Sequence, residues 1–494
     1  MRETHAASAS TLPSVRDWAN QVFSRASGAP LREGNSVALL KDAAENYPAW
    51  LTAIATARQS IDIEMYIIHE DAEGQRFADA LLRRAADGVR VRLLYDWMGG
   101  FGKTSARFWK RLRAGGVDVR CYNPPRFDRP LAWLSRDHRK TITVDGLVAF
   151  VTGLCVGRMW AGDPARGVEP WRDTGVAVRG PAIADVEAAF AEAWAAAGGA
   201  PAAAPAVPSP AGDVSLRVVA TVPNTAGLFR VDQLVTAMAR RNLWLTDAYY
   251  AGTAAYVEAL RAAARDGVDV RLLVPGASDI ALMRPFSRAG YRPLLEAGVR
   301  VFEWNGTMIH AKTAVADGRW ARVGSTNLNI ASWLGNRELD VIVEDEAFAT
   351  QMEEMFLHDL ENATEIVLQR NRVRAPGAPP RRRAAATSGG GSGGRVAAGV
   401  VRVGNTVSAA VADTRVLEPV EAHIALIAAA MLAGLAALAF TYPRGIAYAA
   451  AVIAAWLAAA MLVRSIELYR TRRQRRRRDA ETRATPPDHA AAKE

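Results

Sequence analysis

The sequence predicts an α/β protein made of two duplicated halves, because one strand, helix, strand pattern occurs twice along the chain. Residues 60–94 hold a β-branched and aromatic run, an amphipathic stretch that ends at an Asp-Gly pair, and a strand of alternating Val and Leu. Residues 243–273 repeat this order, and a shorter Ala-Gly echo with a further strand pattern follows each copy. We therefore expect two α/β halves related by a pseudo-twofold axis, with a pseudo-twofold active site.

Composition divides the chain into seven segments. A stretch rich in Ala, Pro and Gly separates the two halves, and the run from Ser388 to Gly394 cannot pack a core. The predicted segments are an N-terminal extension (1–29), the first half (30–194), a connector (195–213), the second half (214–369), a basic and Gly/Ser-rich linker (370–422), a hairpin (423–464) and a basic tail (465–494).

Positive charge is concentrated at the end of the chain. Residues 370–494 hold 20 Lys and Arg against 8 Asp and Glu, whereas residues 1–369 hold 41 against 43. Proteins that bind nucleic acid gain much of their affinity from Lys and Arg, so this near-neutral core disfavours a nucleic-acid partner. The chain has two cysteines, Cys121 and Cys155, which excludes a disulfide framework and Cys-cluster metal sites.

Two uncharged apolar runs near the end of the chain, Ile424 to Tyr442 with 19 residues and Ile446 to Val463 with 18, predict a C-terminal transmembrane helical hairpin. A buried hairpin of a soluble domain is the alternative, because the runs are short and rich in alanine. Arginines cluster after the second run, including Arg475 to Arg478, whereas the turn holds only Arg444. Excess positive charge marks the cytoplasmic side, and no signal-peptide pattern follows Met1. We expect an inner (cytoplasmic) membrane protein with its catalytic domain and C-terminus in the cytoplasm, next to anionic lipid.

Each half contains the pattern H-x-K-x4-D-G. Its members are His138, Lys140 and Asp145 in the first half, and His310, Lys312 and Asp317 in the second. Alternation along a strand would place each His and its Lys on one face. One copy would be a weak signal, but coincidence is improbable for two copies at matching places in a duplicated unit.

Two His-Lys pairs suit the chemistry of phosphate esters. One imidazole can attack phosphorus while the other protonates the leaving oxygen, which gives a covalent intermediate that a second acceptor resolves. The two ammonium groups can neutralise the non-bridging oxygens of the phosphate. We expect no metal and no other cofactor, because a lysine two residues after each histidine opposes a bound cation.

The duplicated motif resembles the phospholipase D superfamily, and within it the bacterial cardiolipin synthases. The resemblance covers roughly residues 30–365 and includes three further matches, which are Gly324-Ser325-Thr-Asn327, Trp171-Arg-Asp173-Thr-Gly175 and Asn336-Arg-Glu338. In this family an acid about thirty residues beyond each catalytic histidine fixes that imidazole through its other nitrogen. By position, the resemblance assigns Asp173 to His138 and Glu338 to His310.

The resemblance also assigns roles to the residues of the site. It implies that His138 is the nucleophile and His310 the general acid, and that Asp145 and Asp317 are mainly structural. The catalytic residues are expected to be His138, Lys140, His310, Lys312, Asp173 and Glu338, and the substrate-binding residues Gly153, Ser325 and Asn327.

The sequence departs from the family pattern at two places. The first copy of Gly-Ser-x-Asn reads Thr152-Gly153-Leu154-Cys155, so a phosphate-contacting Asn is replaced by a cysteine, which we interpret as a small buried residue. The apolar hairpin follows the catalytic halves, whereas typical cardiolipin synthases carry their hydrophobic segments before them. Trp133, just ahead of the first motif, is a candidate for contact with acyl chains, with core packing as the alternative.

The expected function is a membrane-associated phosphatidyltransferase that makes cardiolipin from phosphatidylglycerol through a phosphohistidine. A phospholipase D that hydrolyses phospholipids is the alternative, because water competes with a lipid alcohol for the intermediate. A nuclease and a non-catalytic scaffold are less favoured, since the core is near neutral and both His-Lys pairs are intact. The expected partners are phospholipids and an anionic membrane surface, with no nucleic acid.

Overall fold

The computed structural model of the chain describes residues 15–126, 134–201, 204–279, 287–288, 290–369 and 372–374, and scattered positions between 430 and 466. All strands among these described residues belong to one compact unit. The scattered positions from 430 onward belong to a separate unit and include short helical stretches.

The strands of the compact unit follow the predicted repeat. Those that begin in the first half are β1 (Arg32–Lys41), β2 (Ser60–Met65), β3 (Arg90–Asp96), β4 (Asp118–Tyr122), β5 (Lys140–Val144), β6 (Val148–Thr152) and β7 (Thr174–Arg179). Those that follow are β8 (Val214–Thr221), β9 (Asn242–Thr246), β10 (Asp269–Pro275), β11 (Arg300–Trp304), β12 (Thr313–Ala316), β13 (Trp320–Gly324), β14 (Glu338–Glu344), β15 (Ala363–Gln369) and β16 (Arg372–Arg374).

The helices alternate with the strands. Before the connector they are α1 (Val15–Ser27), α2 (Asp42–Thr56), α3 (Ala72–Ala86), α4 (Trp97–Gly100), α5 (Ala106–Ala114), α6 (Arg158–Ala161), the short 3-10 turn η2 (Pro164–Arg166) and α7 (Ile183–Ala196). After it they are α8 (Gly227–Met238), α9 (Ala254–Arg265), α11 (Arg292–Glu296), the π-helical turn η3 (Ala331–Gly335) and α12 (Glu346–Glu361).

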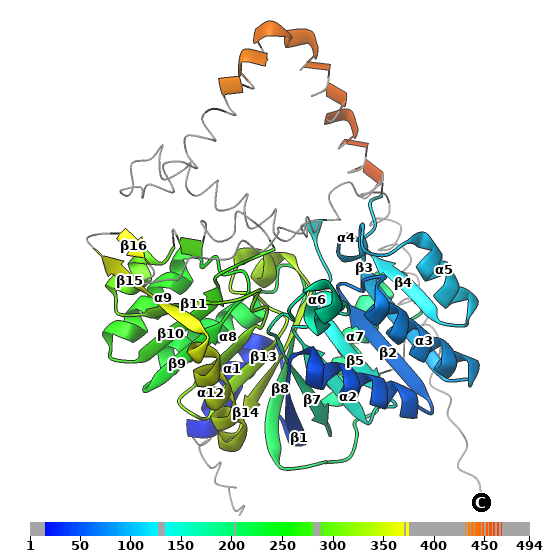
Figure 1. Cartoon of the computed structure of the whole chain (residues 1–494), viewed down its shortest axis with the longest axis horizontal. Helices are drawn as coiled ribbons and strands as arrows, with labels where there is room; N and C mark the ends of the chain where they lie inside the picture. Colours follow the sequence, from blue (N-terminus) through cyan, green and yellow to red (C-terminus); the bar gives the residue numbers. More distant parts are fainter. Residues whose placement is uncertain are drawn as a thin grey trace, which may run out of the picture. The chain divides into compact units, whose positions relative to one another are not determined.

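The described strands form one 16-stranded sheet with a symmetric order, β16-β15-β11-β10-β9-β12-β13-β14-β8-β1-β7-β6-β5-β2-β3-β4. Counted outward from the central antiparallel β1–β8 pair, each half repeats the same seven-strand order, and β15 and β16 extend one edge. In each half three strands pair in parallel, β2-β3-β4 and β9-β10-β11. The prediction of an α/β fold in duplicated halves is thus confirmed, and Figure 1 shows the first half in blue to cyan and the second in green to yellow.

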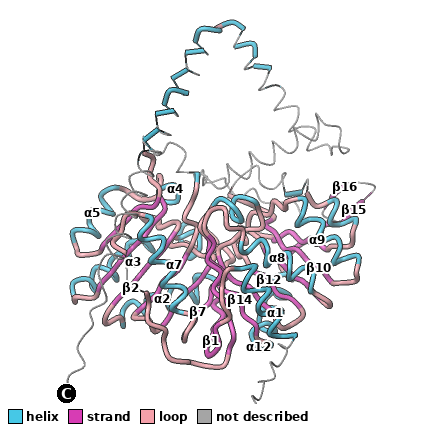
Figure 2. Tube along the Cα trace, turned by 180° about the vertical axis from the view of Figure 1, so that it is seen from behind, coloured by secondary structure: helices cyan, strands magenta, loops and turns pink. Residues whose placement is uncertain are grey.

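Helices cover the sheet in a way that repeats between the halves. Helices α2, α3 and α5 contact strands of the first half, and α8, α9 and α11 contact strands of the second (Figures 1 and 2). Helices α7 and α12 contact strands of both halves, α7 reaching β8 and α12 reaching β1. Their apolar faces belong to one buried cluster that also contains strand residues of both halves. Burial of apolar surface therefore stabilises the contact between the halves as well as each half by itself.

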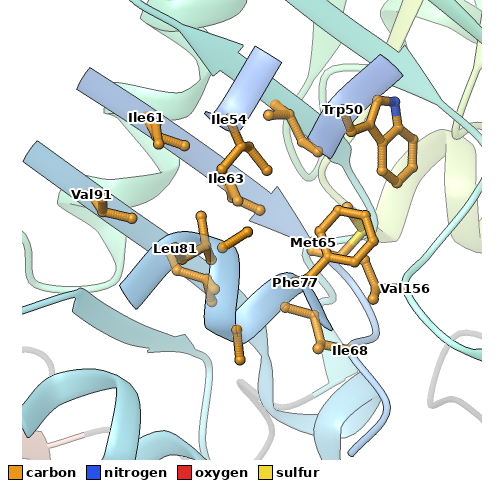
Figure 3. Close-up of a cluster of buried hydrophobic side chains, with 14 of the residues drawn as sticks. Trp50, Ile54, Ile61, Ile63, Met65, Ile68, Phe77, Leu81, Val91 and Val156 are labelled. Carbon is orange, nitrogen blue, oxygen red and sulfur yellow. The ribbon is translucent and has the colours of Figure 1, made fainter. Parts of the chain in front are cut away.

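A second buried cluster belongs to the first half alone. Residues from α2, β2 and α3, including Trp50, Ile63 and Phe77, fill the space between the helices and the sheet (Figure 3). The alternation along β2 explains this, because successive side chains of a strand point to opposite faces of the sheet. This packing fixes the carboxyl end of β2, where Tyr66 begins the loop that reaches the first His-Lys motif.

The predicted hairpin at residues 423–464 lies largely outside the described residues. Among the residues that the structure does describe, no helix is both long enough and apolar enough to cross a membrane.

Candidate active site

The two motif histidines lie just ahead of equivalent strands. His138 lies two residues before β5, and His310 lies three residues before β12. The sequence predicted that each His and its Lys would share one face of a strand, but the strands begin later. The backbone N–H of His138 instead donates to the carbonyl of Arg337 at 2.9 Å, and that of His310 donates to the carbonyl of Arg172 at 2.6 Å. Each histidine is therefore tied to the opposite half.

The carboxylates that hold the imidazoles also come from the opposite half. Nδ1 of His138 lies 2.9 Å from Oε2 of Glu338, and Nδ1 of His310 lies 2.7 Å from Oδ2 of Asp173. The assignment of Asp173 to His138 and of Glu338 to His310 is wrong, and the pairs are exchanged. The reason is that Arg337 and Arg172 form short parallel bridges with Asp137 and Ile309, which places each acid next to the histidine of the other half.

Each orienting carboxylate receives further donors. The hydroxyl of Ser325 donates to Oε2 of Glu338 at 2.6 Å, and the amide of Asn336 donates to Oε1 at 3.2 Å. The indole of Trp160 donates to Oδ2 of Asp173 at 3.2 Å. Gly153 is the counterpart of Ser325 in the repeat, and a Cβ at this position would lie 2.2 Å from Oδ1 of Asp173. A glycine is therefore needed there for Asp173 to approach.

The two lysines complete a single buried cluster of charges. Nζ of Lys312 lies 3.0 Å from Nδ1 and 3.1 Å from Nε2 of His310. Lys140 and Lys312 each donate to the backbone carbonyl of the histidine two residues before. Nζ of Lys140 also lies 5.0 Å from the ring centroid of Tyr66. An anion would be stabilised next to these ammonium groups, because water screens a buried charge poorly.

Burial dominates the protonation of the site. It lowers the pKa of His138 to about 4, although Glu338 opposes the shift. It lowers the pKa of His310 to about 4 as well, with Lys312 adding to the shift and Asp173 opposing it. Burial also lowers the pKa of Lys312 to about 8. At pH 7 both imidazoles are therefore neutral, and with Nδ1 turned to a carboxylate, Nε2 is the nitrogen that carries the lone pair.

The carboxylates respond in the opposite direction. Burial alone would raise the pKa of Asp173, but His310 and Lys312 hold it below its usual range. Burial would likewise raise the pKa of Glu338, which His138, Lys140 and Ser325 hold below its usual range. Both acids are ionised at neutral pH, so each can accept a hydrogen bond from the Nδ1–H of its partner histidine.

The motif aspartates lie at the turns that follow β5 and β12. Asp145 accepts backbone N–H groups from Arg58, Gln59 and Ser60, at 2.7 to 2.8 Å. Asp317 accepts those of residues 240, 241 and 242 in the same way. Burial opposes ionisation of Asp145, but these three amides lower its pKa. Both carboxylates thus join the turn to the start of a neighbouring strand.

Aromatic rings surround the two imidazoles unequally. Trp160, Trp171 and Tyr249 lie 5.7, 5.5 and 5.8 Å from the ring of His310, measured between centroids. Among the described residues, His138 has one such neighbour, Tyr66 at 4.8 Å.

Sequence reasoning missed the contacts of Trp160 and Asn336 with the orienting acids. Asn336 lies in a motif that the family resemblance already marked, whereas a single tryptophan between strands has no signal that separates it from core packing.

Three other predicted positions have different outcomes. Cys155 is buried, and burial raises the pKa of its thiol to about 11, which agrees with a packing role. Asn327 is buried, and its side-chain oxygen accepts no hydrogen bond from the described residues. Trp133 lies outside the described residues.

Within the described part of the chain, no group of three or more His, Cys, Asp or Glu is placed to hold a metal ion.

The chain is similar to known proteins over both motif-bearing segments. A family model described as "Cardiolipin synthase, PLD-like domain" matches residues 50–158 and 235–360, and each matched segment contains one histidine of the site. Cardiolipin synthase A of Pseudomonas putida is 33% identical over 355 residues, which cover 69% of this chain and 72% of that protein. The chain belongs to the cardiolipin synthase family.

Other relatives agree with this membership of the cardiolipin synthase family. The cardiolipin synthase of Halalkalibacterium halodurans is 31% identical over 358 residues, which cover 70% of each chain. Cardiolipin synthase A of Pseudomonas aeruginosa (strain LESB58) is 35% identical over 355 residues, covering 69% of this chain and 70% of that protein. The crystal structure of phosphatidylserine synthase from Haemophilus influenzae Rd KW20 matches with a TM-score of 0.54 and 15% identity. It covers 70% of this chain and 91% of that one, and it supports the fold alone.

Proposed function

We propose that the protein is a phosphatidyltransferase that makes cardiolipin from phosphatidylglycerol through a phosphohistidine. The observation that carries this proposal is the crossed arrangement of the site. Each imidazole has Nδ1 bound to a carboxylate, at 2.9 Å in His138 and 2.7 Å in His310, so Nε2 of each is left to react. Two buried lysines lie beside the imidazoles and supply charge for a phosphodiester anion.

In the first step Nε2 of His138 attacks the phosphorus of the donor lipid. The bond between phosphorus and the glycerol oxygen breaks, and that oxygen takes a proton from Nε2 of His310. Burial lowers the pKa of His310 to about 4, but an anionic phosphodiester held next to the ring favours the imidazolium. Glycerol leaves, and the phosphatidyl group stays on His138.

In the second step the hydroxyl of another phosphatidylglycerol attacks the phosphohistidine. Its proton passes to Nε2 of His310, the phosphorus–nitrogen bond breaks, and cardiolipin leaves with His138 restored. If water attacks instead, the product is phosphatidic acid, which is the phospholipase D alternative. Lys140 and Lys312 neutralise the phosphate in both steps. Gly153, Ser325 and Asn327 are proposed to lie around it, with Ser325 acting through its hydrogen bond to Glu338.

We further propose that residues 423–464 anchor the protein in the inner (cytoplasmic) membrane, with the catalytic domain and the C-terminus in the cytoplasm. The two apolar runs and the arginines that follow them support this proposal. Anionic lipid attracts basic segments by about 1 kcal/mol per Lys or Arg, which favours a membrane rich in phosphatidylglycerol.

The test is incubation of the full-length protein with phosphatidylglycerol vesicles and separation of the products by mass spectrometry. Cardiolipin and glycerol in equal amounts are expected, and the variant His138→Ala is the control for background. Phosphatidic acid as the sole product would make the protein a phospholipase D. Cleavage of single-stranded DNA without lipid turnover would place it among the nucleases.

A further inference from the structure

The aromatic surroundings of His310 form a wall that has no counterpart at His138 among the described residues. Trp160 meets the imidazole of His310 edge to face, with 82° between the ring planes. Trp171 lies more nearly parallel to it, with 33° between the planes, and the two indoles are 5.0 Å apart. Tyr249 comes from the second half and meets His310 at 82°. Both tryptophans come from the first half, between β6 and β7.

The segment that carries the two indoles is fixed to the opposite half. The backbone N–H of Arg172 donates to the carbonyl of Met308 in the second half at 2.9 Å, and that of Trp171 donates within the first half to the carbonyl of Met159 at 2.8 Å. The hydroxyl of Thr307 donates to the carbonyl of Pro170 at 3.0 Å. These bonds lie on both sides of Trp171 in the sequence, so its indole is held beside His310 by the backbone.

The two indoles of this wall offer few polar groups. The N–H of Trp160 is already bonded to Asp173, and tryptophan has no other hydrogen-bonding group. Trp160 is buried, whereas Trp171 is half-buried, so part of its indole is exposed close to His310. A water molecule needs two to four polar partners to reside stably at a site, and aromatic carbon provides none. The carbon chain of a lipid alcohol can instead pack against the same indoles.

We propose that Trp171, supported by Trp160, is a specificity-determining residue that disfavours water as the acceptor at His310. This inference rests on the proposed function, because it concerns the second step of that reaction. There a hydroxyl oxygen forms a bond to phosphorus, its proton moves to Nε2 of His310, and the bond from phosphorus to His138 breaks. The same bonds form and break whether the hydroxyl belongs to water or to a lipid alcohol. The surroundings of His310 therefore decide which of the two is activated.

The experiment measures the ratio of phosphatidic acid to cardiolipin made from phosphatidylglycerol vesicles by the full-length protein. The variant Trp171→Ala is expected to raise this ratio at least fivefold while it still releases glycerol. The variant Trp171→Phe keeps an aromatic ring and is expected to remain within twofold of the wild type. Trp320→Ala is the matched control, because Trp320 is also half-buried but begins β13 at the end remote from Ser325.

The outcomes separate this inference from the function on which it rests. A wild-type protein that makes no lipid product removes the proposed function. A wild-type protein that makes cardiolipin, together with an unchanged ratio in an active Trp171→Ala variant, removes the role of Trp171 alone. If Trp171→Ala does not fold, Trp171→Leu replaces it, and incorporation of ¹⁸O from labelled water into phosphatidic acid gives the same comparison. An equal rise in the ratio for Trp320→Ala would show a general loosening of the fold and would also overturn the proposal.

Discussion

Oε2 of Glu338 lies 2.9 Å from Nδ1 of His138, although 200 positions separate the two residues and they belong to different halves of the repeat. The same carboxylate accepts the hydroxyl of Ser325 at 2.6 Å and the amide of Asn336 at 3.2 Å. Glu338 is therefore held by donors from its own half while it orients the histidine of the other. A carboxylate in this position fixes the tautomer of an imidazole and stabilises the imidazolium.

The crossed pairs predict which histidine responds to which acid. Glu338→Gln removes the negative charge beside His138, so we expect the pKa of His138 to fall further and that of His310 to stay unchanged. Asp173→Asn should do the reverse, and both variants should lose on the order of 10²–10⁴ in rate. Titration of histidines labelled with ¹⁵N, read by NMR, measures both values. A response of His310 to Glu338→Gln would contradict the crossed arrangement.

The nucleophile is predicted to be His138. Rapid acid quenching during turnover, followed by peptide mapping, should find the phosphatidyl group on a peptide that contains His138. The variant His310→Ala should form this adduct more slowly in the first turnover, because the leaving oxygen then lacks its proton donor. A modified peptide that contains His310 instead would exchange the two roles.

Binding of the phosphodiester should weaken in alkali because of Lys312. Burial lowers the pKa of this lysine to about 8, and a lysine carries its charge only below its pKa. The inhibition constant of a soluble dialkyl phosphate, whose own charge does not change in this range, should rise by up to about tenfold per pH unit above pH 8. The variant Lys312→Arg keeps its charge, so the rise of its inhibition constant should begin at a higher pH, where Lys140, whose pKa burial also lowers, loses its charge. An alkaline limit that is unshifted in Lys312→Arg would assign the effect to another group.

The motif aspartates are predicted to affect stability more than catalysis. Asp145→Ala removes three hydrogen bonds to a charged acceptor and should lower the free energy of unfolding by about 1–3 kcal/mol. Asp145→Asn should cost less, because asparagine also tolerates the positive φ of 55° at this position. Urea unfolding measures the loss, and Asp317→Ala should behave like Asp145→Ala. A thousandfold loss of rate in a folded Asp145→Asn variant would show that the residue is catalytic.

The hairpin is predicted to anchor the protein. A chain that ends near Ser388 should be extracted from membranes without detergent, whereas the full-length chain should require it. A cysteine introduced near Glu494 should be protected from a membrane-impermeant reagent in intact cells and should react after lysis. Labelling of that cysteine in intact cells would reverse the proposed orientation.

The repeat and the two His-Lys motifs could be predicted from the sequence because both are local patterns. The strand, helix, strand order depends on periodicity within about thirty residues, and β2, α3 and β3 follow it. The pairing of the orienting acids could not be predicted, because it depends on a short bridge between residues such as Arg172 and Ile309 that are far apart in the chain. Spacing alone favoured the nearer histidine in the sequence.

The environment of His310 could not be predicted from the sequence either. Trp160 and Trp171 are aromatic residues between two strands, and such residues most often belong to a hydrophobic core. Only the fold shows that one indole donates to Asp173 while both lie against His310. In the same way, the structure is needed to explain the glycine at position 153. The carboxylate of Asp173 occupies the space that a side chain of residue 153 would fill.

The exchange of acids between the halves has a consequence during synthesis on the ribosome. A nascent chain that has emerged only as far as β7 can already present His138 and Lys140, but its histidine has no carboxylate partner until Glu338 is made. Asp173 likewise has no histidine partner until His310 has been made. A polypeptide that ends before His310 therefore contains only half of the site, and the two-histidine reaction proposed above requires that both halves have been made and have docked.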